Sequence, residues 1–193
     1  MRFNETISWQ VPTWVASFVD KWPSEYGSQQ DRMRFAARLA LENVEQGTGG
    51  PFGAAVFSAD QHELVAVGVN LVTQVNASIA HAEMVALTLA QKALGTFDLS
   101  KAGRYELVTS VEPCAMCLGA IPWSGVERVL SGATAADAEA IGFDEGIKPT
   151  PWTASLRERG IEVYTEIERQ AGVAALAAYV RLGGAVYNGN QGR

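Results

Sequence analysis

The chain has 193 residues, a net charge of −6 and a hydrophobic content of 48%. This length suits one well-buried domain, and the composition excludes disordered and fibrous proteins. No stretch approaches the ~20 apolar residues that cross a bilayer, and the first residues lack the apolar core of a signal peptide. We therefore expect a cytoplasmic protein. The fifteen basic residues are scattered, which favours a small neutral substrate over nucleic acid.

An N-terminal extension, residues 1–30, precedes the single expected domain, residues 31–193. Apolar residues in the extension have helical spacing, and Pro23 followed by Gly27 ends this helix. The apolar positions are Val11, Trp14, Val15 and Phe18. We expect the helix to pack on the main body, because it has too few cations for a membrane surface.

The rest of the chain alternates between strands and helices. Strands are expected at 53–59, 63–69, 105–111, 126–131 and 161–165. Helices are expected at 31–46 with Asp31 as N-cap, at 80–94, from Cys114 onward, at 133–140, between 151 and 160, and at 168–182. This alternation predicts an α/β fold of three layers, α/β/α, with a mixed central sheet.

The only two cysteines, Cys114 and Cys117, are three positions apart. On a helix this spacing puts both sulfurs on one face, where they can bind one ion. Pro113 suits the start of a helix, whose free N–H groups stabilise thiolates. Alone, the pair is compatible with a redox-active dithiol, with half of a structural zinc site or with half of a catalytic zinc site.

His81 and Glu83 favour the catalytic site. Both fall in the first turn of the expected helix 80–94, so two helices can point their N-termini at one spot. One imidazole and two thiolates leave a fourth tetrahedral position for water, as in catalytic zinc sites. The other histidine, His62, lies in a hairpin turn where we expect it to be solvated. A structural site would therefore lack its fourth ligand.

Glu83 would then act as a proton shuttle. A carboxylate beside zinc-bound water can take a proton, which leaves hydroxide as the nucleophile, and can return that proton to a ring nitrogen. Hydroxide adds to an amidine carbon, and ammonia leaves. The order His81-Ala82-Glu83 and then Pro113-Cys114-Ala115-Met116-Cys117 resembles the signature of zinc deaminases.

With these residues, the chain resembles the cytidine deaminase superfamily from about Gly50 to Gly146. Within it, the chain is similar to bacterial guanine deaminases, which convert guanine to xanthine, and whose relatives accept ammeline. The resemblance is also carried by Gly50-Pro51-Phe52-Gly53, Asn70, Leu118-Gly119-Ala120, Ile121-Pro122-Trp123 and Ile141-Gly142-Phe143-Asp144-Glu145-Gly146. It implies a cytidine-deaminase-like fold and a zinc-dependent aminohydrolase of purine catabolism.

The resemblance also implies roles for single residues. Zinc would be held by His81, Cys114 and Cys117, with Glu83 as the shuttle and Glu145 as a second carboxylate that helps ammonia leave. The implied substrate contacts are Phe52, Asn70, the backbone N–H of Ala82, Trp123, Phe143 and Asp144. Members form homodimers, some with exchanged C-terminal segments, which would bring Tyr187 near the partner's site.

The residues alone leave alternatives open. Phe52 and Trp123 are equally compatible with core positions, Asn70 with a turn, and 143–145 with an acidic surface loop. Residues 76–79 read Asn-Ala-Ser-Ile where tRNA-adenosine deaminases usually carry Asn-Asp-Pro-Thr, which argues against a tRNA substrate.

Other functions are also compatible with parts of the pattern. A deaminase could act on ammeline, cytosine or adenosine in tRNA. A structural zinc module that binds a partner and a dithiol redox protein are the alternatives of another class, although a redox role would leave His81 and Glu83 without a task.

Overall fold

The computed structural model describes residues 7–23 and 25–189, and these residues contain one five-stranded sheet. The strands are β1 (Gly53–Ser58), β2 (Leu64–Val69), β3 (Tyr105–Val111), β4 (Arg128–Ala133) and β5 (Glu162–Tyr164). Their order is β2-β1-β3-β4-β5. β1 pairs with β2 and β3 in antiparallel fashion, whereas β3, β4 and β5 are parallel. The predicted mixed sheet is confirmed.

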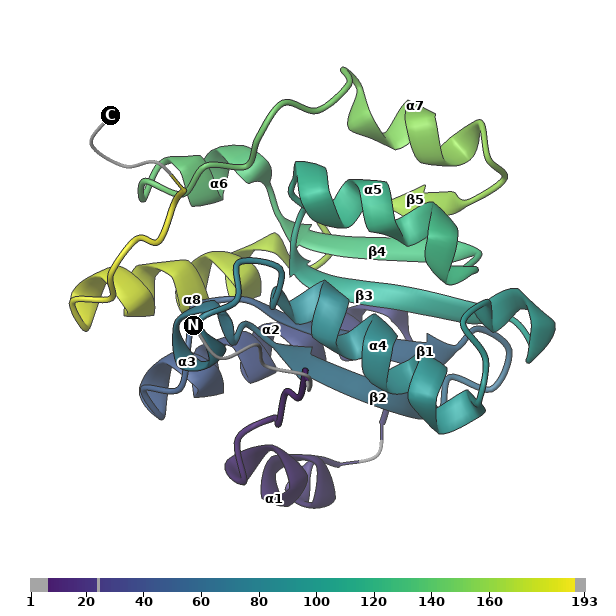
Figure 1. Cartoon of the computed structure of the whole chain (residues 1–193), viewed down its shortest axis with the longest axis horizontal. Helices are drawn as coiled ribbons and strands as arrows, with labels where there is room; N and C mark the ends of the chain where they lie inside the picture. The colour runs from purple at the N-terminus through teal and green to yellow at the C-terminus, as the bar shows by residue number, and fades with distance from the viewer. Residues whose placement is uncertain (1–6, 24, 190–193) are drawn as a thin grey trace, which may run out of the picture.

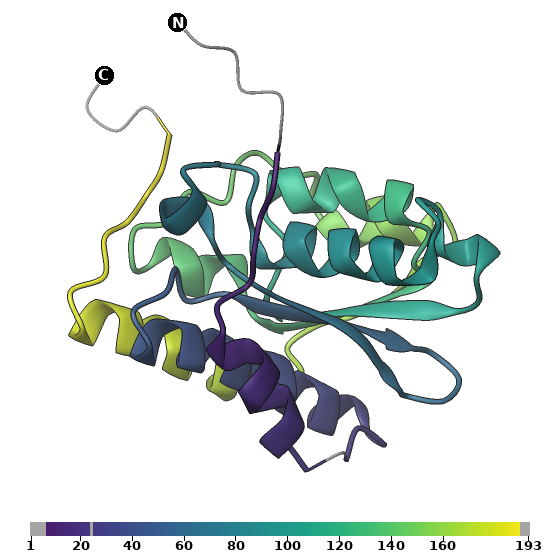
Figure 2. The same ribbon diagram turned by 60° about the horizontal axis from the view of Figure 1, so that its bottom comes forward.

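Helices cover both faces of the sheet (Figure 1). The helices α4 (Ala82–Leu94), α5 (Ala115–Ser124) and α7 (Trp152–Arg157) lie on one face. On the other face lie α2 (Gln29–Glu45) and α8 (Arg169–Arg181), and Figure 2 shows the two helical layers with the sheet between them. The shorter helices are α3 (Val72–Val75), η1 (Leu99–Lys101) and α6 (Ala135–Glu139).

Alternation along the strands builds two separate apolar layers. Ala54 and Val56 of β1 pack with α4 and α5, whereas Ala55 and Phe57 pack with α2. The same alternation recurs in β3 and β4. Each face of the sheet is therefore closed by helices, as the expected α/β/α layering requires.

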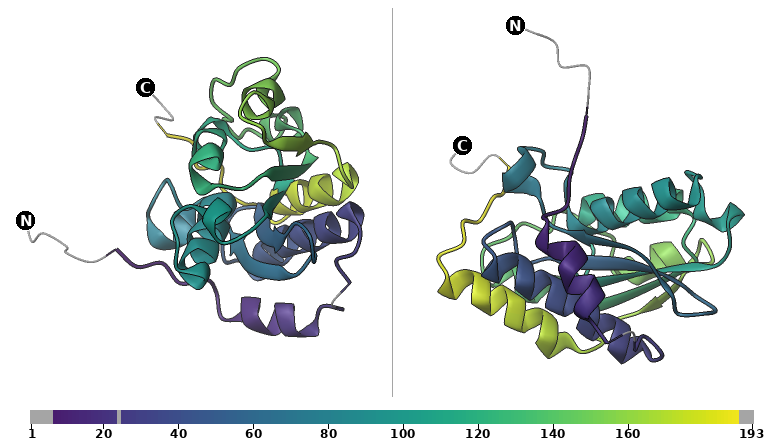
Figure 3. Two further views of the ribbon diagram at one scale, coloured as in Figure 1. Left: turned by 90° about the vertical axis from the view of Figure 1, so that its right-hand side faces the viewer. Right: turned by 90° about the horizontal axis from the view of Figure 1, so that it is seen from below.

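The helix α1 (Trp14–Lys21) packs outside α2, as the left view of Figure 3 shows. The rings of Phe18 on α1 and of its C-cap residue Trp22 lie 5.6 and 5.3 Å from the ring of Phe35, measured between centroids, and Phe35 is fully buried on α2. The expectation that this segment packs on the body is confirmed for its described residues; residues 1–6 and 24 lie outside them. Among the described residues, no helix combines the length and apolar content that crossing a membrane requires.

The start of α2 corrects one prediction. Its N-cap is Ser28, and Asp31 is the third residue of the helix. The Asp31 N–H donates to the Ser28 hydroxyl at 3.1 Å, while the Asp31 carboxylate accepts from the Ser28 N–H at 3.0 Å. This reciprocal capping box satisfies two N–H groups, so the helix begins before Asp31.

The pairing register gathers several predicted residues at one edge of the sheet. Gly53 pairs with Val69 and Ala54 pairs with Thr109, so the start of β1 meets the ends of β2 and β3. Phe52 and Asn70 are the residues next to those pairs. In sheets of this kind, ligands bind beyond the carboxyl ends of parallel strands.

Candidate active site

Two helix N-termini meet at this edge. His81 is the N-cap of α4 and Cys114 is the N-cap of α5, both with extended backbone. The Nδ1 atom of His81 lies 3.5 Å from the sulfur of Cys114 and 3.7 Å from that of Cys117. All three candidate ligand atoms lie within 4.8 Å of one another. The structure therefore brings together the three residues that the sequence predicts as metal ligands.

The donor set fits zinc. Two sulfurs and one imidazole nitrogen are ligands of tetrahedral zinc, and three protein ligands are typical of its catalytic sites. A hydrogen bond from the Cys117 side chain, together with His81, outweighs burial and lowers the pKa of Cys114 to about 4. The lowered pKa favours the thiolate form of the half-buried Cys114 beside the buried Cys117, an arrangement that a divalent cation stabilises.

His62 does not join this cluster. Among the described residues, the only group of three or more His, Cys, Asp or Glu side chains close enough to hold a metal is His81, Cys114 and Cys117. A closed, four-ligand structural site therefore lacks its fourth protein ligand there.

Glu83 lies in the first turn of α4 and is 6% exposed. Burial and the nearby Cys114 thiolate raise the pKa of its carboxyl, whereas His81 lowers it. A carboxyl with a raised pKa can both accept and return a proton near neutral pH, which general acid–base catalysis requires.

A cavity of about 170 Å³ opens beside these residues. Phe52 and Phe143 form part of its wall, with ring centroids 5.0 Å apart in an edge-to-face arrangement. His81, Glu83 and Cys114 also line it. This volume is below the ~300–1,000 Å³ of pockets for drug-sized ligands, so it suits a small molecule.

Glu145 reaches the cavity from the loop after α6. It is 5% exposed, and burial raises the pKa of its carboxyl to about 7, against the opposing effect of Lys148. Its backbone carbonyl accepts a hydrogen bond from the Ala115 N–H at 2.8 Å, which ties this loop to the N-terminus of α5. Asp144 lines the cavity beside it.

The C-terminal tail closes another side of the cavity. Tyr187 lies against Phe143, with ring centroids 5.0 Å apart. Asn188 accepts a hydrogen bond from the Asp144 N–H at 2.9 Å and donates one to the Gly142 carbonyl at 2.8 Å. Tyr187 thus lines the pocket of its own chain.

Asn70 and Ala82 do not line this cavity, but each adjoins a residue that does: the Asn70 N–H donates to the Phe52 carbonyl at 3.1 Å, and Ala82 follows His81. The Asn70 side chain is buried; its oxygen accepts from the Val72 N–H at 3.2 Å, and its amide nitrogen has no hydrogen-bond partner among the described residues. Ala82 is the first residue of α4, where a backbone N–H has no partner within the helix. The Asn70 side-chain amide and the Ala82 backbone N–H are therefore both available to donate a hydrogen bond to a ligand.

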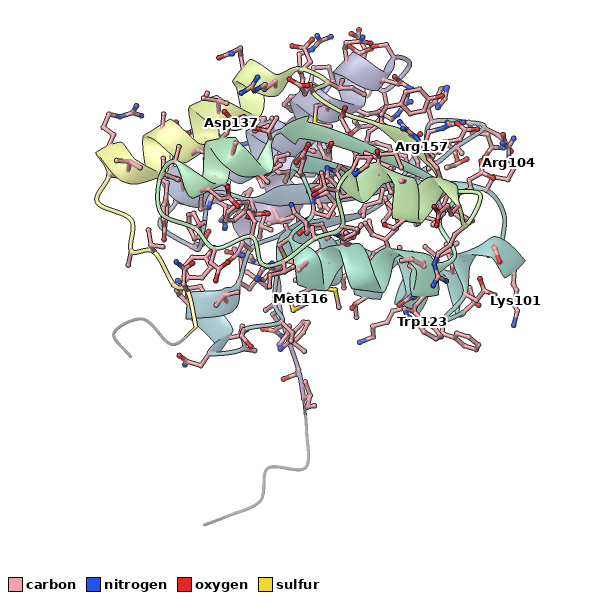
Figure 4. All side chains as sticks on the ribbon, turned by 90° about the horizontal axis from the view of Figure 1, so that it is seen from above. Lys101, Arg104, Met116, Trp123, Asp137 and Arg157 are labelled. Carbon is pink, nitrogen blue, oxygen red and sulfur yellow. The ribbon has the colours of Figure 1, made fainter. Side chains whose placement is uncertain are left out.

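Trp123, a predicted substrate contact, lies away from the cavity of its own chain. It lies in the last turn of α5, 83% exposed, at the periphery of the molecule in Figure 4. It lines a groove with Pro122 and Ile147 and does not line the cavity beside His81. Because α5 begins at the candidate metal ligands, Trp123 lies about two turns away from them.

The sequence analysis missed several pocket residues. Val72 belongs to α3, a helix of four residues that is too short to show a periodic pattern. Glu112 lines the cavity, and its carboxylate accepts from the Ala135 N–H at 3.1 Å, where α6 begins. Asn188 lies in a Gly- and Asn-rich tail without a recognisable motif.

Comparison with known proteins agrees with this site. Residues 27–133 match the family described as the cytidine and deoxycytidylate deaminase zinc-binding region. The chain therefore belongs to this family of zinc-binding deaminases, and its fold is cytidine-deaminase-like. It is an aminohydrolase that uses zinc, with His81, Cys114 and Cys117 as the metal-binding group.

Several relatives are guanine deaminases. The chain is 39% identical to the guanine deaminase of Bacillus subtilis over 132 residues, which cover 68% of this chain and 81% of that protein. The solved structure of the guanine deaminase from Nitrosomonas europaea is 41% identical, with a TM-score of 0.85 and coverage of 93% and 98%. A structure of NE0047 in complex with 2,6-diaminopurine is 42% identical, with a TM-score of 0.88 and coverage of 96% and 98%.

Proposed function

We propose that this protein hydrolyses guanine to xanthine and ammonia. The observation that supports guanine as the substrate is the buried carboxylate of Glu145 on the wall of the small cavity. Guanine offers several N–H donors, and an ionised carboxylate only accepts hydrogen bonds. The similarity to two guanine deaminases over most of the chain supports the same substrate.

Glu83 would move the protons of this reaction. It would take one proton from the attacking water and deliver it to the ring nitrogen next to the carbon that bears the amino group. Zinc held by His81, Cys114 and Cys117 would supply the Lewis acidity that makes water a nucleophile at neutral pH. Glu83 would then carry the proton of the added hydroxyl to the amino group, so that the carbon–nitrogen bond breaks, a carbonyl forms and ammonia leaves, while the Glu145 carboxylate accepts a hydrogen bond from a substrate N–H.

The remaining contacts hold a flat ring. Phe52 and Phe143 would wall its faces, since aromatic side chains favour stacked and edge-to-face contacts. Asn70 would donate to the polar edge of the ring through its unpaired amide, and the Ala82 N–H would meet a ring carbonyl. Asp144 would border the base next to Glu145.

Other aminated rings are the alternative substrates, because ammeline and cytosine also carry an amidine carbon. Adenosine in tRNA is disfavoured by the net charge of −6. A screen of ammonia release over guanine, adenine, cytosine, their nucleosides and aminotriazines tests the proposal. We expect the highest kcat/KM with guanine. A higher kcat/KM with another ring would identify that ring, and not guanine, as the substrate.

We propose that the protein is a homodimer whose interface includes the groove at α5. Gly119, Pro122 and Trp123 line this groove together with Ile147, which is fully exposed. Exposed apolar patches of this kind mark interaction surfaces, and a second copy presents the same self-complementary patch. Trp123→Glu should yield monomers in light scattering, whereas Val180→Glu on α8 should stay dimeric; a dimeric Trp123→Glu protein would reject this interface.

Exchange of the C-terminal tails is a separate part of the dimer proposal. Tyr187 and Asn188 of the same chain already reach the cavity, and exchanged tails would supply the same side chains from the partner. Mixed dimers of a Glu83→Gln chain and a Tyr187→Ala chain discriminate the two arrangements. Exchange predicts one fully normal pocket in each mixed dimer; loss of all normal turnover would contradict it.

We further propose that residues 31–193 form the catalytic domain, that 1–30 are an extension of it, and that the protein is cytoplasmic. Cys114 and Cys117 are free thiols, and a reducing compartment keeps thiols available for zinc. Fractionation of cells of the source organism, followed by detection of the protein, tests the location.

A further inference from the structure

We propose that Trp14 of the N-terminal extension is a positioning residue for the substrate pocket, acting through Thr48 and Asn43. The predicted effect on substrate binding rests on the function proposed above. Its structural part concerns the two chain segments that carry Phe52 and Asn70.

Asn43, fully buried on α2, joins these two segments. Its side-chain amide donates one hydrogen bond to the Gly50 carbonyl at 2.9 Å and another to the Asn70 carbonyl at 3.0 Å. Because carbonyl oxygens only accept, the amide nitrogen must face both of them. One side chain therefore fixes the distance between the segment before β1 and the end of β2.

Thr48 fixes the other end of this amide. Its hydroxyl donates to the Asn43 side-chain oxygen at 2.7 Å and accepts from the Trp14 indole N–H at 2.9 Å. An indole N–H can only donate, so it leaves the hydroxyl proton for Asn43. The hydrogen bonds thus run in one direction, from Trp14 through Thr48 to Asn43 and on to the two carbonyls.

Because the turn at Gly49 and Gly50 is closely packed, a displacement of this turn would also displace residues of the pocket. Gly49 has no room for a side chain, because a Cβ there would overlap the Asn70 carbonyl oxygen. A Cβ on Gly50 would overlap the hydroxyl of Tyr187, which lines the cavity. The turn between α2 and β1 therefore contacts the substrate-binding wall directly.

Trp14 is itself held in place. Its ring packs edge-to-face on Phe18, with centroids 6.0 Å apart, and Phe18 packs on Phe35 of α2. The extension thus delivers a fixed hydrogen-bond donor to a turn that borders the pocket. None of the hydrogen bonds that run from Trp14 to the Gly50 and Asn70 carbonyls involves a candidate zinc ligand, so the effect should fall on substrate binding.

The test compares Trp14→Phe, Thr48→Val and the double variant. Each single change removes one hydrogen bond and keeps the local packing, and should raise KM for guanine by ~3- to 10-fold. The kcat value and the zinc content should change by less than about twofold. Because both residues act through one relay, the double variant should be no worse than the worse single variant.

Trp22→Phe is the matched control, because Trp22, the C-cap residue of α1, packs on the Phe35 ring that Phe18 also contacts. It should leave KM unchanged even if it lowers thermal stability by as much as Trp14→Phe does. An unchanged KM in Trp14→Phe, additive effects in the double variant, or an equal rise in Trp22→Phe would overturn the proposal.

A second readout does not depend on the substrate. The Phe52 N–H donates to the Gly50 carbonyl at 2.9 Å, and the Asn70 N–H donates to the Phe52 carbonyl at 3.1 Å. Both amides should exchange hydrogen faster in Trp14→Phe and at the wild-type rate in Trp22→Phe. Unchanged exchange in Trp14→Phe would refute the relay, whereas failure of the wild-type protein to deaminate guanine would refute only the proposed substrate.

Discussion

The Lys148 ammonium lies 3.6 Å from the carboxylate of Glu145, and the two side chains are only 10% and 6% exposed. The same ammonium donates a hydrogen bond to the Pro113 carbonyl at 3.0 Å, immediately before the zinc-binding Cys114. Lys148 therefore connects the loop that carries Glu145 to the start of α5. This contact places the second carboxylate next to the metal-binding residues.

Replacing Lys148 should shift the pH dependence of the reaction. Burial raises the pKa of Glu145 to about 7, and Lys148 opposes that rise. If the substrate needs an ionised Glu145, activity falls as pH drops below this pKa. Lys148→Met should raise the pKa further and move the acid limb of kcat/KM to higher pH, while Lys148→Arg should keep it in place. An acid limb at the same pH in Lys148→Met would contradict this role.

Glu83→Gln should retain zinc and lose turnover by ~10²- to 10⁴-fold, because an amide cannot accept and return a proton. Metal analysis and steady-state kinetics on the same preparation test both parts. Glu83 is not a predicted ligand, so zinc content should equal that of the wild type. Normal turnover in the variant would show that Glu83 has no catalytic role.

Glu145→Gln should lower kcat for guanine and leave the metal bound. The neutral amide keeps the size of the side chain but loses the charge that accepts the substrate's N–H groups. Glu139→Gln, an exposed acid on α6, is the control and should have wild-type kinetics. Equal rates in the wild type and Glu145→Gln would show that the Glu145 carboxylate has no role in turnover.

Removing zinc should also destabilise the fold. A ligand that binds only the native state at ~100 times its Kd stabilises a protein by about 2.7 kcal/mol, which for this length corresponds to a Tm change of ~5–10 °C. Calorimetry before and after chelation measures this change. Cys117→Ser should have a low Tm that chelator does not change further, and His62→Asn should respond as the wild type does.

The layers of the fold follow from local pattern, whereas several site details do not. The alternation of strands and helices predicted the mixed sheet, and the 105–111 strand was predicted with the bounds of β3. Ser28 was missed as a cap because Asp31 is also a common N-cap residue, and only the capping box shows which residue comes first.

The metal-binding group could be predicted because its residues occur in two short motifs, each at the start of a helix. Trp123 could not be placed from the sequence, since a single aromatic residue on a helix fits a pocket, a core or an interface. Lys148 and Asn188 act through contacts with residues 35 and 44 positions away, which no local pattern encodes.

The most direct test measures zinc content and products in one purified preparation incubated with guanine. We expect about one zinc per chain, and xanthine and ammonia released in equal amounts at a rate that falls with the zinc content after chelation. Stoichiometric zinc without ammonia release from guanine, or full activity after complete removal of the metal, would contradict a zinc-dependent guanine deaminase.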